Sequence, residues 1–357
     1  MKIQLQTPIC QLLQIRYPIF QAGMAGGITT PEMVASVSEA GGLGSLGAAY
    51  LSPEEIRQAV RTIRQYTQKP FSVNLFALEM KDDFSRLEEV EQVLQPFYEE
   101  LNIQPPSPPL QIPNRFTKQI DVLLDEKVPI LSSALGIFPD EVIKEAHKQG
   151  QFVSTMVTTV EEAILAEEKG SDFIVAQGSD AGGHRGTFTL KHHPMGANIG
   201  TFSLIPQIVD HVHIPVVAAG GIMDGRGLVA ALALGAQGIQ LGTRFLTTIE
   251  SGANATYQEA LLTSTEESTV LTTAFTGRPA RGLRNTLIDQ FEATGVPPLP
   301  FPSQHALTSP IRQAASQQKK AQFLSLWAGQ ATHLLKQGQH AHEVVQEIIR
   351  EAQEIIE

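Results

Sequence analysis

Residues 215–243 read PVVAAGGIMDGRGLVAALALGAQGIQLGT, and this stretch contains the pattern that decides the fold. Two short apolar runs, 215–219 and 238–241, each end in glycine, and a segment with helical spacing lies between them. A strand, a helix and a second strand in this order are typical of a parallel sheet covered by helices. The stretch therefore predicts one strand–helix–strand unit.

Runs of the same kind recur eight times along the chain and are separated by helical patterns. We place them at residues 18–21, 43–46, 71–74, 129–132, 152–156, 173–177, 215–219 and 238–241. Several of these runs carry consecutive apolar residues, as expected when helices cover the outer side of a parallel sheet. Eight such repeats predict an α/β fold, a closed (β/α)₈ or TIM barrel.

Two of the helices between these strands begin with a pattern that predicts their first residue. Ser52 is followed three residues later by Glu55, and Thr159 is followed in the same way by Glu162. In such a capping box each side chain accepts a hydrogen bond from the other residue's backbone N–H. The two helices are therefore expected to begin immediately after Ser52 and Thr159.

Two parts of the chain are additions to the barrel in this prediction. An acidic helical pattern at 84–100 and a proline-rich stretch at 104–109 follow the third strand, and apolar residues at helical spacing recur in 344–356. We expect four parts: 1–78 with strands one to three, 79–126 as an inserted helical and proline-rich lid, 127–250 with strands four to eight and the cofactor site, and 251–357 as a helical extension packed on the barrel.

Composition excludes several classes of function. The chain has 357 residues, a net charge of -11 and a single cysteine, Cys10. We expect no nucleic-acid partner, because the basic surface that binds phosphate backbones is missing. No stretch is apolar for the roughly 18 residues that a membrane span needs, so a cytoplasmic protein with no membrane contact is expected. One cysteine supports neither a disulfide nor an iron–sulfur cluster, and redox chemistry would need an organic cofactor.

The segment 176–186, AQGSDAGGHRG, is the first candidate for chemistry. It places His184 in a glycine-flanked loop directly after the sixth strand. Glycine lets the backbone approach a flat or charged ligand closely, and imidazole titrates near neutral pH. His184 is therefore a candidate catalytic residue, with an exposed loop histidine as the alternative.

The seventh and eighth strands end in glycine at the place where many barrels bind phosphate. Gly220 and Gly221 follow the seventh strand, and Gly242 and Thr243 follow the eighth. Loops after these strands offer backbone N–H groups and a helix N-terminus to a phosphate group. The alternative is that the glycines only form tight turns.

Amide side chains end two other strands. Asn74 follows the third strand and Gln177 ends the sixth, and an amide matches the alternating acceptor and N–H edge of a pyrimidine-like ring. Residues 22–24, Ala22-Gly23-Met24, have little bulk near the first strand's end. Together with a phosphate site, these residues indicate flavin mononucleotide (FMN) across the barrel mouth, although either amide alone fits a cap or turn equally well.

Four ordered motifs give the chain a resemblance to a known family over nearly its whole length. They are PIFQAGM at 18–24 with GGLG at 41–44, AQGSDAGGHRG at 176–186, AAGGIMDGRG at 218–227 and QLGTRFL at 240–246. The chain resembles the nitronate monooxygenases, also called 2-nitropropane dioxygenases. The resemblance implies FMN, with His184 beside the flavin as the catalytic residue. The expected cofactor-binding residues are Ala22, Gly23, Met24, Asn74, Gln177, Gly182, Gly183, Gly220, Gly221, Gln240, Leu241, Gly242 and Thr243.

The implied reaction is the oxidation of an alkyl nitronate, such as propionate 3-nitronate, by dioxygen to a carbonyl compound and nitrite. His184 then acts either as a base on a nitroalkane or, when protonated, as a partner for the nitronate anion. The chain departs from the family pattern at two positions. Asp180 stands where glutamate is frequent, and Phe301 stands where relatives commonly have tyrosine.

Other functions remain as alternatives. An FMN- and NAD(P)H-dependent enoyl-acyl-carrier-protein reductase or quinone reductase of the same superfamily has similar motifs, and a phosphosugar lyase or isomerase would use similar phosphate loops. No metal site is expected, because adjacent histidines such as His192 and His193 point apart, and no cluster of carboxylates accompanies them or the pair His211 and His213. The sequence leaves the oligomeric state open between a monomer and a homodimer.

Overall fold

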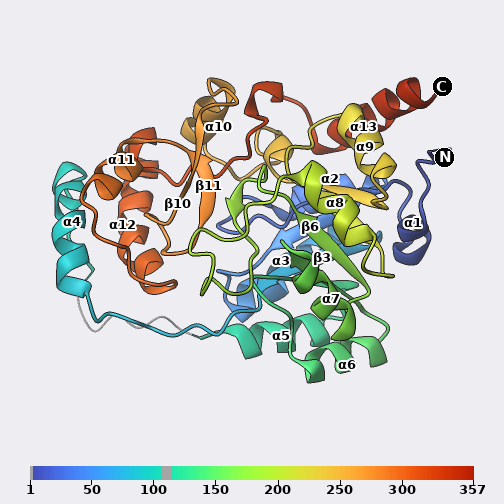
Figure 1. Cartoon of the computed structure of the whole chain (residues 1–357), viewed down its shortest axis with the longest axis horizontal. Coiled ribbons are helices and arrows are strands. Elements are labelled where there is room, and N and C mark those ends of the chain that lie inside the picture. The colour runs from blue at the N-terminus through green and yellow to red at the C-terminus, as the bar shows by residue number, and fades with distance from the viewer. Residues whose placement is uncertain (1–2, 107–113) are drawn as a thin grey trace.

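The structure is a computed structural model that describes residues 3–106 and 114–357 (Figure 1). Eight parallel strands form its main sheet, in the order β1-β9-β8-β6-β5-β4-β3-β2. All eight predicted strands are present. They are β1 (Ile19–Gln21), β2 (Gly44–Gly47), β3 (Phe71–Phe76), β4 (Ile130–Ala134), β5 (Phe152–Val157), β6 (Phe173–Gln177), β8 (Val216–Ala219) and β9 (Gly238–Leu241).

The sheet closes into a barrel between its first and last members. β1 pairs in parallel with β9, and a bridge between Phe20 and Leu43 links β1 to the chain just before β2. Backbone hydrogen bonds of 2.9 Å join Gln21 N to Leu43 O and Leu43 N to Ile19 O. The predicted TIM barrel is therefore confirmed, and the carboxyl ends of its strands meet at one rim.

Helices cover the outside of the barrel, and one short helix closes its other end. The outer helices are α2 (Pro31–Glu39), α3 (Pro53–Tyr66), α5 (Phe116–Asp125), α6 (Asp140–Lys148), α7 (Val160–Glu168), α8 (Thr201–Val209) and α9 (Gly225–Ala233). The short helix α1 (Pro8–Leu13) packs with the apolar side chains of the barrel interior. Its Cys10 is buried and forms no disulfide.

The two predicted helix starts have different outcomes. α3 begins with the expected capping box, in which Ser52 and Glu55 bond each other's backbone N–H groups. α7 is capped by Thr159, but the carboxylate of Glu162 does not return to Thr159. It accepts hydrogen bonds of 2.7 Å from Thr158 N and Phe188 N, so the second half of this predicted box is wrong. Glu162 is buried and satisfies two other backbone groups that lie near it.

The segment expected as a lid at 79–126 contains two helices with different neighbours. α4 (Leu87–Glu100) packs against α11 (Thr286–Ala293) and α12 (Ser303–Gln317), away from α5 (Figure 1). Tyr98 of α4 donates a 2.8 Å hydrogen bond to the backbone oxygen of Leu307. In contrast, α5 packs on α3 and β3 as the barrel helix before β4. The proline-rich stretch at 104–109 lies partly outside the described residues.

The chain after residue 250 contains strands as well as helices. β10 (Thr269–Thr272) and β11 (Ala280–Leu283) form an antiparallel sheet with β7 (Gly183–His184), the strand that carries the candidate histidine. α10 (Ala255–Leu262), α11 and α12 surround this sheet. The extension was expected to be helical, and these two strands are an addition that sequence analysis did not predict.

The last helix packs on the barrel as its apolar stripe predicts. α13 (Ala341–Ile356) buries Val344, Val345, Ile348 and Ile349 against α9 and α2. These are the helix before the last barrel strand, β9, and the helix after the first, β1. α13 thus occupies the place of the helix that would follow β9. Within residues 3–106 and 114–357, no helix is both long and apolar enough to span a membrane.

Candidate active site

A cavity of about 730 Å³ opens at the carboxyl ends of the barrel strands. Strand register brings its residues to one level, since Gln177 pairs with Ala219 and Ala219 with Gln240. All of the expected site residues line this cavity, and the structure brings them together from six segments of the chain. They are Ala22, Gly23, Met24, Asn74, Gln177, Gly182, Gly183, His184, Gly220, Gly221, Gln240, Leu241, Gly242 and Thr243.

The glycines after β8 are required by the backbone. Gly220 and Gly221 have φ of +114° and +70°, which side-chain-bearing residues rarely adopt. A Cβ atom on Gly220 would lie 2.7 Å from Thr201 Oγ1. The N-terminus of α9 is closed by its own cap, because Asp224 accepts hydrogen bonds from Arg226 N and Gly227 N. A phosphate at this rim would therefore rely on the backbone of 220–221 and 242–243 and not on the N-terminus of α9.

Glycine is required at position 182 for a different reason from the one expected, which was close approach to a ligand. A Cβ atom there would lie 2.5 Å from the backbone of Ala328 and Gly329, so glycine allows the segment 328–329 to pack on the histidine loop. The same segment reaches the rim after β9, where Gly329 N donates a 2.9 Å hydrogen bond to Thr243 Oγ1. Residues 328–329 thus join the histidine loop to the predicted phosphate loop.

The two predicted amides have different partners. Asn74 Nδ2 donates a 3.0 Å hydrogen bond to Ser132 Oγ on the neighbouring strand. Gln177 Nε2 donates to His184 O at 3.0 Å, and its Oε1 accepts from Gly186 N at 2.8 Å. The first task of Gln177 is therefore to hold the backbone of the histidine loop, which leaves one N–H and one oxygen lone pair for a ligand.

A buried arginine and a carboxylate fix the rest of this loop. Arg185 is fully buried and donates to the backbone oxygens of Gln177, Gly178 and Ala197 at 2.8–3.3 Å. Asp180 Oδ2 accepts from Thr201 N at 2.8 Å and from Thr201 Oγ1 at 2.7 Å. Burial alone would raise the pKa of Asp180, but these hydrogen bonds outweigh it and hold the pKa below its ordinary value. The shorter carboxylate at this position therefore binds the start of α8.

His184 lies in the wall of the cavity among aromatic rings. Its Nε2 is 3.0 Å from Thr276 Oγ1, and its ring centroid lies 5.8–6.2 Å from those of Phe76, Phe301 and Trp327. β11 fixes its backbone, because Ala280 pairs with His184. The histidine is therefore held by a strand and by a hydroxyl group, and it is not a free surface residue.

The surroundings of His184 favour its neutral form. Burial, together with the positive charges of Arg278 and Arg312, lowers the pKa of His184 to about 3. Arg278 belongs to the same segment as Thr276, since Arg278 N donates a 3.3 Å hydrogen bond to Thr276 Oγ1. Near neutral pH, before substrate binds, the imidazole can accept a proton.

A second polar group in the cavity was missed by sequence analysis. Tyr50 follows β2, and its ring stacks on His305 of α12 with centroids 4.6 Å apart. Arg312 Nη2 lies 3.2 Å from His305 Nδ1 and donates to His305 O at 3.0 Å. All three residues line the cavity. Helical spacing of polar residues within 303–317 was the available signal, but it does not tell which face of a helix after the barrel meets the site.

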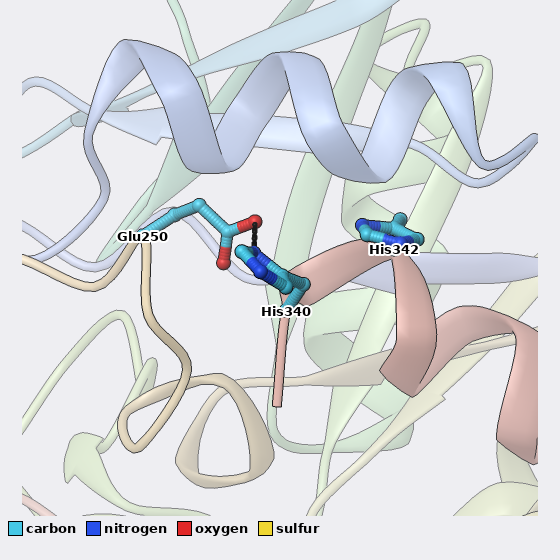
Figure 2. Close-up of side chains that lie close together, drawn as sticks. All are labelled: Glu250, His340 and His342. Carbon is cyan, nitrogen blue, oxygen red and sulfur yellow. Dashed lines mark hydrogen bonds and ion pairs between the residues drawn. The ribbon is translucent and has the colours of Figure 1, made fainter. Parts of the chain in front are cut away.

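Among the described residues, one group of side chains has the atom types and spacing to hold a metal ion. Glu250, His340 and His342 place one ligand atom each within 4.8 Å of one another, outside the cavity (Figure 2). Glu250 already accepts from Ala341 N at 2.9 Å, from His340 Nδ1 at 3.2 Å and from Ser36 Oγ at 3.2 Å. These bonds make Glu250 a cap for the start of α13. His192, His193, His211 and His213 are exposed.

The fold and the cavity define a (β/α)₈-barrel enzyme with its site at the carboxyl ends of the strands. The model of the nitronate monooxygenase family matches residues 6–351. A probable nitronate monooxygenase of Staphylococcus saprophyticus is 42% identical over 357 residues, which cover 99% of both proteins. Another, of Staphylococcus haemolyticus, is 40% identical over 98% of this chain and 97% of that protein.

Solved structures agree with this result. Nitroalkane oxidase from Streptomyces ansochromogenes is 38% identical, with a TM-score of 0.90 over 97% of this chain and 98% of that one. FabK from Thermotoga maritima is 29% identical, with a TM-score of 0.77 over 99% and 98%. The chain belongs to the nitronate monooxygenase family and is an oxidoreductase, as the sequence motifs predict.

Proposed function

We propose that this enzyme oxidises alkyl nitronates, such as propionate 3-nitronate, with dioxygen to a carbonyl compound and nitrite, using FMN. The observation that carries this proposal is a neutral histidine, His184, held in the wall of a cavity large enough for a flavin and a small substrate. Family membership supports nitronate oxidation in general. Our proposal adds that FMN is the cofactor, that His184 acts on a proton of the substrate and that dioxygen is the oxidant.

The chain's own residues fit FMN. Ala22, Gly23, Gly220, Gly221 and Gly242 are small, so a planar ring and a phosphate can approach the backbone closely. Asn74 has one N–H in use, and Gln177 has one N–H and one lone pair left, which suits the polar edge of an isoalloxazine ring. When bound there, FMN would accept electrons from the substrate and pass them to dioxygen.

His184 would supply the proton chemistry. Burial and two arginines hold the pKa of His184 low, so the free enzyme presents a neutral imidazole. The negative charge that forms on a bound nitroalkane as its carbon loses a proton would raise that pKa and favour proton transfer to the imidazole. The hydroxyl of Thr276, bonded to Nε2, fixes the ring's orientation. We therefore favour the role of base over that of a permanently protonated anion partner. The rings of Phe76, Phe301 and Trp327 keep bulk water from this proton.

The direct test is aerobic turnover by the FMN-loaded enzyme. Propionate 3-nitronate is supplied, and oxygen uptake and nitrite are measured together. The proposal predicts both, without added NADH. Parallel assays contain NADH with an enoyl thioester or with a quinone, because FabK is a structural relative. Rapid NADH oxidation in either assay, with no nitrite from the nitronate, would show that the proposed function is wrong.

A further inference from the structure

Arg312 lies in a part of the cavity wall that has no proposed contact with the reacting atoms, and its positive charge enters the proposed chemistry only by lowering the pKa of His184. The side chains of His305, Ser309 and Arg312 project from α12 into the cavity lining, three and four residues apart along one face of the helix. Tyr50 stacks on His305 from the opposite side of this region. The group combines a cation with neutral hydrogen-bonding side chains, which is the composition of an anion site.

The guanidinium of Arg312 has no acidic partner. Among residues 3–106 and 114–357, no carboxylate lies within ion-pair distance of it, whereas Arg57, Arg226, Arg244 and Arg284 each have one. Its hydrogen bonds go to the backbone oxygens of His305 and Thr308 and to the His305 ring, at 3.0–3.4 Å. The side chain of Arg312 is partly buried, and a partly desolvated positive charge without a counter-charge is stabilised by a bound anion.

The position of Arg312 relative to His184 sets the size of that anion. The ring centroid of Phe301 lies 6.2 Å from that of His184 and 6.1 Å from that of His305, so the two imidazole rings are at most about 12 Å apart. Arg312 is bonded to His305, which places its guanidinium in the same part of the cavity. A molecule with a reactive group at His184 and a second charge a few carbon atoms away fits within this limit.

We propose that Arg312 is a specificity-determining residue that binds a second anionic group, a carboxylate, on the end of the substrate remote from the nitronate. This inference rests on the proposed function for the identity of the reacting end. A guanidinium offers two parallel N–H donors to a carboxylate, so it fixes the substrate's direction in the cavity as well as its charge. The phosphate of FMN has its own glycine-lined position at 220–221 and 242–243.

The first test measures binding without turnover. Succinate is a matched probe, because it carries a carboxylate in place of the nitro group, and its diamide, succinamide, has the same length but no charge. Isothermal titration of the FMN-loaded enzyme compares the wild type with Arg312→Met, Arg312→Lys and the surface control Arg284→Met. We expect succinate affinity to fall about 10- to 100-fold in Arg312→Met, and less in Arg312→Lys. The succinate affinity of Arg284→Met and the succinamide affinities of all variants should stay within about threefold of the wild type.

The second test uses two nitronates. For propionate 3-nitronate, Arg312→Met should raise KM by about 10- to 100-fold with little change in kcat, whereas KM for propyl-1-nitronate should change less than about threefold. Equal losses for both nitronates, or lost FMN with unchanged succinate binding, would overturn the proposal. Melting temperature of each variant reports folding, and recovery by Arg312→Lys excludes a merely structural role. If no nitronate is oxidised but succinate binding still depends on Arg312, the proposed function fails and the anion site stands.

Discussion

The two walls of the cavity differ in the residues that form them. The barrel wall consists of small residues and backbone, such as Gly23, Gly220 and Gly242, at the ends of strands whose register is fixed by the sheet. The opposite wall, which we call the side-chain wall, comes mainly from residues after 250, with Tyr50 from the loop after β2, and includes large side chains such as Arg312 and Trp327. A wall of backbone and small residues lets a cofactor bind closely, whereas large polar and aromatic side chains can discriminate between substrates. His184 joins them, because it follows β6 and pairs with β11.

The largest effect on activity is expected from a change at His184, where the two walls meet. His184→Asn keeps a polar side chain of smaller size but removes the proton acceptor. We expect kcat/KM for nitroalkanes to fall about 10²- to 10⁴-fold, the usual contribution of a positioned base. Bound FMN should remain near the wild-type amount, because the flavin contacts proposed here belong to the barrel wall. Nitrite formation and flavin absorbance of the same sample check both statements, and full activity in this variant would remove His184 from the mechanism.

The barrel wall is tested by Gly220→Ala. The new methyl group would lie 2.7 Å from Thr201 Oγ1 at a φ of +114°, so the rim after β8 must shift. We expect FMN affinity to weaken about tenfold or more and the melting temperature to fall. Gly295→Ala is the matched control, since its φ is +71° and nothing lies within 4 Å of its Cβ position. The control should lower stability through backbone strain and leave FMN affinity unchanged; equal loss of FMN in both would contradict this role of Gly220.

The side-chain wall is tested near the histidine by Thr276→Val. This change preserves shape and removes the hydroxyl that lies 3.0 Å from His184 Nε2. The imidazole loses its orienting partner, so we expect kcat to fall about tenfold with KM and FMN content nearly unchanged. Thr276→Ser should restore most of kcat, because it returns the hydroxyl. A large change in FMN content would show that Thr276 serves the cofactor instead.

The smallest expected effect is on stability at mildly acidic pH. The pKa of His184 is lowered to about 3 by burial and by Arg278 and Arg312, whereas the unfolded chain has an ordinary histidine pKa near 6.5. Between these values the unfolded state binds more protons, so stability falls as pH decreases below about 6.5. His184→Asn should therefore lose less melting temperature than the wild type between pH 7.5 and pH 5. An identical loss in both proteins would contradict a depressed pKa at His184.

The fold and one wall of the cavity could be predicted because they depend on local patterns. Each strand carries its own apolar run and turn, and glycine at Gly220 and Gly221 reports a backbone conformation directly. The partner of Glu162 could not be predicted, because Phe188 N meets it only after the chain has folded back across α7. The same holds for Gln177, whose amide binds the loop that follows it.

The side-chain wall was missed for a related reason. Arg312 and Tyr50 are 262 positions apart in a chain of 357 residues, and nothing in the local pattern of either indicates that both line one cavity. β10 and β11 are short and carry few consecutive apolar residues, so the sheet that fixes His184 was also not predicted. Phe301 was found only because it departs from a family pattern.

The central inference about this enzyme is that the barrel wall holds the flavin and the side-chain wall selects the substrate. It is tested most directly by measuring FMN affinity and succinate affinity on the same two variants, Gly220→Ala and Arg312→Met. We expect each variant to lose a different ligand. Gly220→Ala should lose FMN affinity, and its FMN-saturated form should still bind succinate. Arg312→Met should keep its FMN affinity and lose succinate affinity. Loss of FMN affinity to the same extent in both variants would contradict it.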